Sequence, residues 1–301
     1  MRSLWTPWSR PPRGGPGGCS RSFIRSTAPC RGPGLAAGWD LLFLEYADLY
    51  LKVLDSLWSE GELLARGIHR IMSDRGLTRG RVLELFCGNG RVAVPLAAMG
   101  HKVVGVDFSF KFIEEAKKSA RGVGVQERTE FIVGDARRID DVVGSGSGQF
   151  DAVLIVWNSL GYYDRRSDEE ILARSRRLVS EGSLLILANL PHRDQMVSRG
   201  RVVRTFGRYG DLLILEDMEF DPVRSVLSTR MYLLLDEGAG YVRRAGEVYS
   251  EMRIYTPTEL GEIMERTGWS LESVYGDVKR LEKFDPARSP LTMVARAVTP
   301  S

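Results

Sequence analysis

The chain has 301 residues, of which 43% are hydrophobic and 27% charged, and its formal net charge is +3. This composition is ordinary for a globular protein, the small net charge argues against nucleic acid as a partner, and no apolar run reaches the roughly 20 residues that span a membrane. Three cysteines do not make a disulfide framework, so we expect a reducing, cytoplasmic compartment.

Residues 1–38 differ from the rest of the chain. They are rich in Arg, Gly, Pro and Ser and contain neither Asp nor Glu. Such a segment has no apolar periodicity with which to build a core, and we predict a disordered tail. Acid-poor tails with Arg and Ser also occur in mitochondrial transit peptides, so mitochondrial targeting is the lesser alternative. Whether the tail belongs to the mature protein stays open.

The segment before the first predicted strand, residues 40–72, is expected to be helical. Apolar residues recur there at helical spacing in two stripes. Tyr46 and Tyr50 stand four residues apart and therefore share one face of the helix.

Residues 81–107 carry the pattern on which the rest of the interpretation depends. A short apolar strand that contains Glu84 leads into the turn from Gly88 to Gly90, and a helix and a second strand then lead to Asp107. Glycines in such a turn let backbone N–H groups and a helix N-terminus approach a ligand. A carboxylate at the end of the second strand can accept hydrogen bonds from both ribose hydroxyls. The order predicts a nucleotide-binding α/β unit.

Two ligands compete for this unit. Gly88, Gly90 and Ala93 fit the relaxed G-x-G-x-x-A fingerprint of dinucleotide-binding proteins, which alone is a weak signal. Glu84 favours S-adenosylmethionine instead, because a carboxylate beside the loop would repel a pyrophosphate and suits an ammonium group. Asp135, at the end of a third strand, is placed to accept a hydrogen bond from an adenine amino group.

The alternation of strands and helices continues to about residue 190. A strand at 150–156 precedes the turn 157–163, and a fifth buried strand covers 184–188. Between them, Ser167 and Glu170 predict a capping box at the start of a helix.

From residue 201 the apolar positions repeat every second residue, which predicts antiparallel strands. The four candidates are Val202–Tyr209, Leu212–Phe220, Val226–Leu235 and Tyr241–Arg253. The carboxylates in this block have no His or Cys beside them, so a solvated strand face is favoured and no metal is expected. Thr256 and Glu259 predict a second capping box, and the last strands are expected at 269–275 and 291–298.

Four motifs in this order resemble the class I S-adenosylmethionine-dependent methyltransferases, and among them a prokaryotic branch of small-molecule type. The motifs are E-L-x-C-G-x-G-R, V-D-x-S, G-D-x-R and N-S-x-G-Y-aromatic, here at Glu84–Arg91, Val106–Ser109, Gly134–Arg137 and Asn158–Tyr163. The R-x-Y-[ST] signature of that branch matches Arg253–Thr256. The resemblance covers roughly residues 40–297 and is specific for the cofactor, but only suggestive about the substrate.

The resemblance implies an α/β fold, a doubly wound Rossmann-like seven-stranded sheet with an antiparallel β cap or sheet extension inserted after the fifth strand. The implied divisions are a tail (1–38), an α/β domain with N-terminal helices (39–190), the cap or extension (191–255), and a last helix with the final strands (256–301). S-adenosylmethionine is the implied cofactor, held by Glu84, Gly88, Gly90, Asp107, Phe108, Asp135, Ala136 and Trp157.

Substrate contacts are expected at the mouth of the sheet, where ligands bind in open α/β folds. Candidates for catalysis are Tyr162 and Tyr163 after the fourth strand and His192 after the fifth, each with a structural role as the alternative. Candidates for substrate binding are Tyr46, Asn158, Tyr162, Arg253 and Tyr255.

We therefore expect an enzyme that moves a methyl group to N or O of a small molecule by in-line displacement. The alternatives are an RNA or protein methyltransferase on the same fold and a non-catalytic cofactor-binding module. The expected partner is a small-molecule substrate, without nucleic acid or membrane, and the protein is expected to be a monomer or a homodimer.

Overall fold

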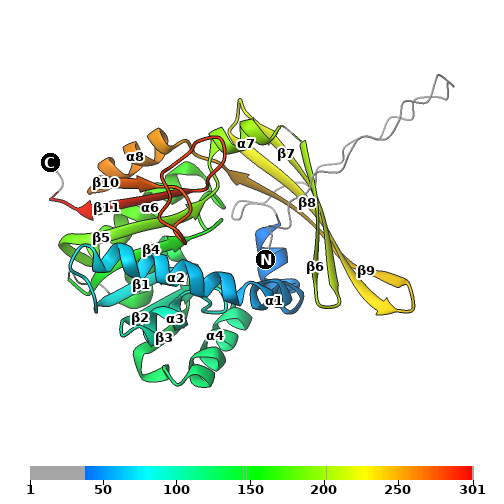
Figure 1. Ribbon diagram of the computed structural model, residues 1–301, viewed down its shortest axis with the longest axis horizontal. Helices are drawn as coiled ribbons and strands as arrows, with labels where there is room; N and C mark the ends of the chain where they lie inside the picture. The colour runs from blue at the N-terminus through cyan, green and yellow to red at the C-terminus, as the bar shows by residue number, and fades with distance from the viewer. Residues whose placement is uncertain (1–37, 145, 147, 201, 300–301) are drawn as a thin grey trace. The chain divides into compact units, whose positions relative to one another are not determined.

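The computed structural model describes residues 38–144, 146, 148–200 and 202–299. The predicted disordered tail therefore lies outside the described residues, except for Gly38. The described chain forms two β-sheets, one of seven strands in the order β10-β11-β5-β4-β1-β2-β3 and one of four strands in the order β6-β7-β8-β9 (Figure 1).

The larger sheet contains five consecutive parallel strands and two further strands, one of which runs in the opposite direction. The parallel strands are β1 (Arg81–Leu85), β2 (Lys102–Asp107), β3 (Thr129–Val133), β4 (Phe150–Val156) and β5 (Val179–Leu190). Of the other two, β11 (Leu291–Ala297) lies between β5 and β10 (Trp269–Tyr275) and runs antiparallel to both, so β10 has the same direction as the five parallel strands. The chain reverses its direction across the sheet between β1 and β4, and in open α/β sheets such a switch point is where ligands bind. The predicted Rossmann-like sheet is confirmed.

Helices cover both faces of this sheet, which explains why its central strands are apolar without alternation. One face packs against α2 (Trp58–Ser73), α3 (Ala93–Ala98) and α4 (Phe110–Val123). The other face packs against α5 (Ile139–Val143), α6 (Arg165–Arg177) and α8 (Pro257–Arg266). Short 3-10 helices, η2 (Gln126–Arg128) and η3 (Ala136–Arg138), flank β3.

The smaller sheet is the predicted antiparallel insertion after the fifth strand, reached through α7 (Arg193–Arg199). Its strands are β6 (Val202–Tyr209), β7 (Leu212–Asp221), β8 (Val226–Gly238) and β9 (Tyr241–Arg253). Alternate residues face inward and share a core with the π-helix η1 (Leu41–Glu45) and with α1 (Ala47–Ser56). In Figure 1 this blue segment lies between the two sheets.

One predicted capping box is correct and one is wrong. Thr256 and Glu259 cap α8 reciprocally, as expected. At α6, however, the N-cap is Asp164, whose carboxylate accepts from the Ser167 N–H at 2.8 Å, so the helix begins before Ser167. Glu170 bonds to Arg174 one turn later instead. No helix in the described ranges is both long enough and apolar enough to span a bilayer.

Candidate functional site

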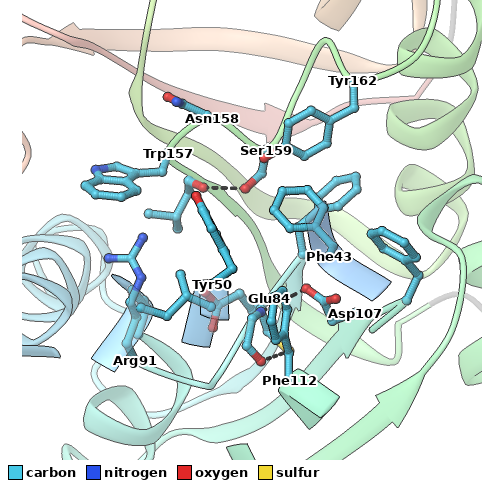
Figure 2. Close-up of a pocket in the computed structure, with 17 residues that line it drawn as sticks. Phe43, Tyr50, Glu84, Arg91, Asp107, Phe112, Trp157, Asn158, Ser159 and Tyr162 are labelled. Carbon is cyan, nitrogen blue, oxygen red and sulfur yellow. Dashed lines mark hydrogen bonds between the residues drawn. The ribbon is translucent and has the colours of Figure 1, made fainter. Parts of the chain in front are cut away.

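A pocket opens at the carboxyl ends of β1, β2 and β4 (Figure 2). It encloses about 730 Å³ of empty space, part of which is open solvent. The N-terminal segment contributes Phe43, Tyr50 and Leu54, and the first two strands and their loops contribute Glu84, Phe86, Cys87, Gly88, Arg91, Val92, Asp107, Phe108 and Phe112. The turn after β4 contributes Val156, Trp157, Asn158, Ser159 and Tyr162. The pocket therefore lies at the switch point of the sheet.

Glu84, near the end of β1, is a buried carboxyl with spare hydrogen-bonding capacity. It is 3% exposed, and the N–H of Ala93, at the start of α3, donates to it. Burial raises its pKa to about 8, an effect that the charge of Arg91 and the Ala93 hydrogen bond oppose. Its Oε2 atom is buried and has no hydrogen-bond partner. The side chain is thus available to a donor that enters the pocket.

Asp107, the last residue of β2, connects the loops that follow the first two strands. Its Oδ2 accepts from the Gly88 N–H and its Oδ1 from the Ser109 N–H, each at 2.9 Å. Burial raises the pKa of the carboxyl to about 6, while the two hydrogen bonds act in the opposite direction. Its position fixes the glycine turn against the start of α4.

Aromatic rings form the outer wall of the pocket. The Phe43 ring centroid lies 5.3 Å from that of Tyr50, 5.8 Å from Tyr162 and 6.0 Å from both Phe108 and Phe112. The Phe43 carbonyl accepts a hydrogen bond from the Ser109 hydroxyl at 2.7 Å, which ties η1 to the start of α4. A π-helix such as η1 is uncommon and frequently marks a functional site. The N-terminal segment therefore closes one side of the pocket.

The turn after β4 is held in a strained conformation. Trp157 has a φ of +67°, unusual for a bulky residue, and its N–H donates to the Ala188 carbonyl at 2.9 Å. The Ser159 hydroxyl is buried and donates to the Val156 carbonyl at 2.7 Å, whereas the Asn158 side chain is exposed. Tyr162 packs against the aromatic wall, and burial raises its pKa well above the ordinary value.

Seven of the predicted site residues line this pocket. Five were expected to hold the cofactor, namely Glu84, Gly88, Asp107, Phe108 and Trp157, and two were expected to contact substrate, Asn158 and Tyr162. The structure brings these residues together from three strand ends.

The predicted adenine contacts lie outside the described pocket lining. Asp135 forms an ion pair with Arg137, whose Nη2 lies 2.6 Å from Oδ2. Burial alone would raise the pKa of the Asp135 carboxyl, but the hydrogen bonds and charge of Arg137 lower it below its ordinary value. Ala136 is buried. The guanidinium of Arg137 lies 4.4 Å from the ring centroid of Tyr163, so that tyrosine also has a partner outside the pocket. Gly90 is not in the lining either; its N–H donates to the Cys87 carbonyl and shapes the turn.

Two further candidates are buried in other places. His192 is fully buried, its Nε2 lies 3.0 Å from the Ser289 carbonyl oxygen, and burial lowers its pKa. Tyr46 contacts the inner face of the smaller sheet, where a Cβ on Gly246 would lie 2.6 Å from its ring. Neither side chain lines the pocket.

The R-x-Y-T signature makes a structural connection. The Tyr255 hydroxyl donates to Asp168 Oδ2 at 2.5 Å, and the Gly161 N–H donates to Oδ1 at 3.3 Å. Burial raises the pKa of Asp168 to about 7. Arg253 pairs with Glu259 of the α8 capping box at 3.2 Å. The signature thus joins the end of β9 to the turn that carries the pocket residues after β4.

Several pocket residues were not identified from the sequence as site residues. Phe43, Tyr50 and Leu54 come from the N-terminal segment, where only Tyr46 was selected. Tyr50 stands one turn after Tyr46 on the same helical face, so the spacing contained the signal. Arg91, the last residue of the first motif, also lines the pocket.

Comparisons with known proteins show which family this chain resembles. Residues 82–182 match a family described as Methyltransferase domain. A provisionally assigned methyltransferase of Bacillus subtilis (strain 168), YqeM, is 27% identical over 212 residues, which make up 66% of this chain and 77% of that protein.

Two solved structures have a similar fold. The CcbJ methyltransferase from Streptomyces caelestis aligns with a TM-score of 0.65 and 23% identity, over 80% of this chain and 90% of that one. CalS10 from Micromonospora echinaspora, an amino pentose methyltransferase with S-adenosylmethionine bound, aligns with a TM-score of 0.62 and 18% identity, over 85% and 98%. At these identities the likeness concerns the fold.

Proposed function

Because the chain belongs to the class I S-adenosylmethionine-dependent methyltransferases, we propose that it methylates N or O of a small-molecule acceptor that enters between the pocket and the smaller sheet. The observation that carries the proposal is the position of the pocket. It lies at the switch point of the larger sheet and shares residues with the core that packs against the smaller sheet. Such a chamber suits a molecule of limited size.

The pocket residues fit S-adenosylmethionine. We assign the cofactor's ammonium group to the unpartnered Oε2 of Glu84, its ribose to Asp107, and its adenine to the ring of Phe108. Gly88 lets the loop backbone come close to the ligand, and Trp157 borders the methionine part. Asp135 and Ala136 remain our candidates for the adenine edge.

S-adenosylmethionine supplies an electrophilic methyl group on a positively charged sulfur, whose thioether is a neutral leaving group. The protein therefore needs chiefly to align the acceptor and exclude water. Phe43 and Tyr50 cover the pocket from the side of the N-terminal segment. The raised pKa of Tyr162 keeps its hydroxyl protonated near neutral pH, so it can donate a hydrogen bond to an acceptor but not remove its proton. Asn158 is exposed at the mouth and can orient the acceptor.

The charge of the smaller sheet favours a small acceptor over RNA. Residues 202–253 contain nine Asp and Glu against seven Arg and no Lys. All seven arginines are paired with carboxylates: Arg204, Arg208, Arg224, Arg230, Arg243, Arg244 and Arg253. Binding to RNA depends on unpaired basic groups that displace counterions from phosphates, and this surface offers few of them. The fold shared with an amino pentose methyltransferase is compatible with a small acceptor.

Labelled methyl transfer tests the proposal. Purified protein is incubated with S-adenosylmethionine carrying an isotopic methyl group and, separately, with a metabolite extract, total RNA and total protein. We expect the label in one or a few small molecules, identified by mass spectrometry, together with one S-adenosylhomocysteine for each methyl transferred. Label confined to RNA or protein would overturn the proposed acceptor class, and binding of the cofactor without any transfer would favour a non-catalytic module.

A further inference from the structure

Glu216, in β7, is a charged residue on the face of the smaller sheet that packs against η1 and α1. Three rows of residues paired across the four strands form the centre of this inner face: Val203, Met218, Thr229 and Ser250, then Thr205, Glu216, Met231 and Val248, and then Gly207, Ile214, Leu233 and Gly246. Glu216 is the only charged side chain among these residues. A carboxylate on such a face is costly unless a partner compensates its charge.

The described chain offers this carboxylate little compensation. Its Oε2 accepts a hydrogen bond from the Thr205 hydroxyl at 2.6 Å, but it forms no ion pair within 4.0 Å with a Lys, Arg or His of the described residues. Glu216 is half-buried, and so are its neighbours on the inner face of β6 and β7, Val203, Thr205 and Met218. This strip of the inner face can therefore receive a ligand.

Tyr50 connects Glu216 with the pocket. The tyrosine lines the pocket (Figure 2) and also packs in the core that η1 and α1 share with the smaller sheet. An ion pair of 2.5 Å between Lys52 and Asp211 ties α1 to the turn between β6 and β7. Burial raises the pKa of the Tyr50 hydroxyl, the charge of Glu216 adds to this effect, and the charge of Arg91 opposes it. Tyr50 therefore lies close to both the carboxylate of the sheet and the arginine of the pocket.

We propose that Glu216 binds a protonated amine of the methyl acceptor. The inference rests on the proposed function and narrows the acceptor from small molecules in general to cationic ones. A carboxylate or phosphate on the acceptor would be repelled by the same charge.

The bound ammonium group is not the site of methylation. A protonated amine has no lone pair with which to attack the methyl group, and Glu216 lies beside the pocket lining, not within it. The reacting N or O atom is therefore another atom of the acceptor, which reaches the pocket past Tyr50. Glu216 is thus a positioning residue that determines which acceptors bind.

The first test asks for the charge of the methylated product. Metabolite extract is incubated with the protein and isotopically labelled S-adenosylmethionine, and the mixture is separated on a cation exchanger at pH 7. A sample without protein gives the signal of the unreacted cofactor, which is itself cationic and is subtracted. We expect the remaining labelled small molecule to be retained by the exchanger.

The second test measures what Glu216 contributes. The extract fraction that supports the transfer serves as the acceptor, and its serial dilution gives the ratio of KM between variant and wild type. Glu216→Gln should raise KM roughly 10- to 100-fold, as expected for the loss of a hydrogen bond between charged groups, with kcat within about twofold of wild type. The affinity for S-adenosylmethionine, measured by calorimetry, should stay within about twofold.

Asp217→Asn is the matched control, because it makes the same chemical change at the next residue of β7. Asp217 points to the outer face of the sheet and pairs there with Arg204 at 2.6 Å, and both side chains are exposed. The control should leave both KM and cofactor affinity unchanged. Glu216→Asp keeps the charge on a shorter side chain, so its KM should lie between those of wild type and Glu216→Gln.

Three results would overturn the inference. A labelled product that is neutral or anionic at pH 7 would show that the acceptor has no cationic group to bind, and an unchanged KM in Glu216→Gln would exclude Glu216 as its partner. Equal losses of acceptor and cofactor binding would make Glu216 a structural residue. A wild-type sample without any labelled small molecule would instead refute the proposed function, on which the inference rests.

Discussion

At the scale of single residues, Asp107 connects the loops after the first two strands, and we propose that it also binds the ribose. We expect Asp107→Ala to weaken binding of S-adenosylmethionine and methylthioadenosine alike, by roughly tenfold or more, because it removes charge-assisted hydrogen bonds to Gly88 and Ser109 and the acceptor assigned to the ribose. Asp48→Ala is a matched control, since it removes only an exposed ion pair with Lys111. Unchanged binding of methylthioadenosine to Asp107→Ala, measured by calorimetry, would remove Asp107 from the nucleoside site.

The same scale shows what the sequence could predict. Glu84 and Asp107 were placed correctly at the strand ends because apolar runs locate those ends. Tyr50 was missed in favour of Tyr46, because spacing defines a helical face but not which turn of that face reaches the pocket. The pairing of Asp135 with a neighbouring arginine depends on side-chain conformation, which spacing does not specify.

At the scale of elements, the crossing of α2 over the glycine loop depends on Gly61. Replacing a helical glycine by alanine usually stabilises a protein by up to about 1 kcal/mol. Gly61→Ala should instead destabilise the fold and weaken cofactor binding, because its Cβ would meet the Arg91 carbonyl at 2.4 Å.

Gly261→Ala in α8 is the matched control for this change, since nothing lies within 4 Å of its Cβ. It should raise the free energy of unfolding in urea titrations, as the general rule predicts. If both alanine variants are stabilised to the same extent, α2 does not pack against Arg91 as closely as described.

The contact between β9 and the turn after β4 yields another prediction. Tyr255→Phe removes the hydroxyl that donates to Asp168 and leaves a buried carboxyl oxygen without a donor. The free energy of unfolding should fall by about 1–3 kcal/mol. Tyr241→Phe, at a residue 73% exposed, should change it by less than about 0.5 kcal/mol. Equal effects in denaturant titrations would show that the Asp168 contact contributes no stability.

The bounds of a strand could be predicted where its apolar residues follow one clear period along the sequence. The strands Val202–Tyr209 and Tyr241–Arg253 were predicted with their observed limits, because strict alternation identifies a sheet with one buried face. The role of Tyr255 could not be predicted in the same way. Its partner Asp168 lies 87 positions earlier in the chain, and only the packing of α6 against α8 brings the two together.

At the scale of the whole molecule, three buried carboxyls couple folding to pH. Burial raises the pKa of Glu84 to about 8, of Asp107 to about 6 and of Asp168 to about 7. The folded protein therefore retains protons that the unfolded chain releases near pH 4, so each group contributes stability at low pH that is lost as the pH rises through its folded pKa.

We expect the ligand-free protein to lose thermal stability between about pH 5 and pH 8. Scanning calorimetry of wild type and Glu84→Gln over this range isolates one of the three groups, because glutamine does not titrate. The variant should show the shallower decline, and the difference between the two curves should grow steadily from about pH 5 to pH 8. Parallel curves would mean that Glu84 titrates at its ordinary pKa.

Cofactor binding should reverse this effect at Glu84. An ammonium group against the unpartnered Oε2 favours the carboxylate and lowers its pKa, so binding at pH 7 should release up to about one proton. In the empty pocket the charge of Arg91 lowers the pKa of this carboxyl and that of Asp107 raises it, and the ammonium group of the ligand adds a second positive charge. Calorimetric titrations in buffers of different ionisation enthalpy measure the protons released.

Two controls identify the titrating group. Methylthioadenosine, which has no ammonium group, should release far fewer protons, and Glu84→Gln should release few with either ligand. Equal proton release by the two ligands in the wild type would place the titrating group at the nucleoside end, beside Asp107 instead of Glu84.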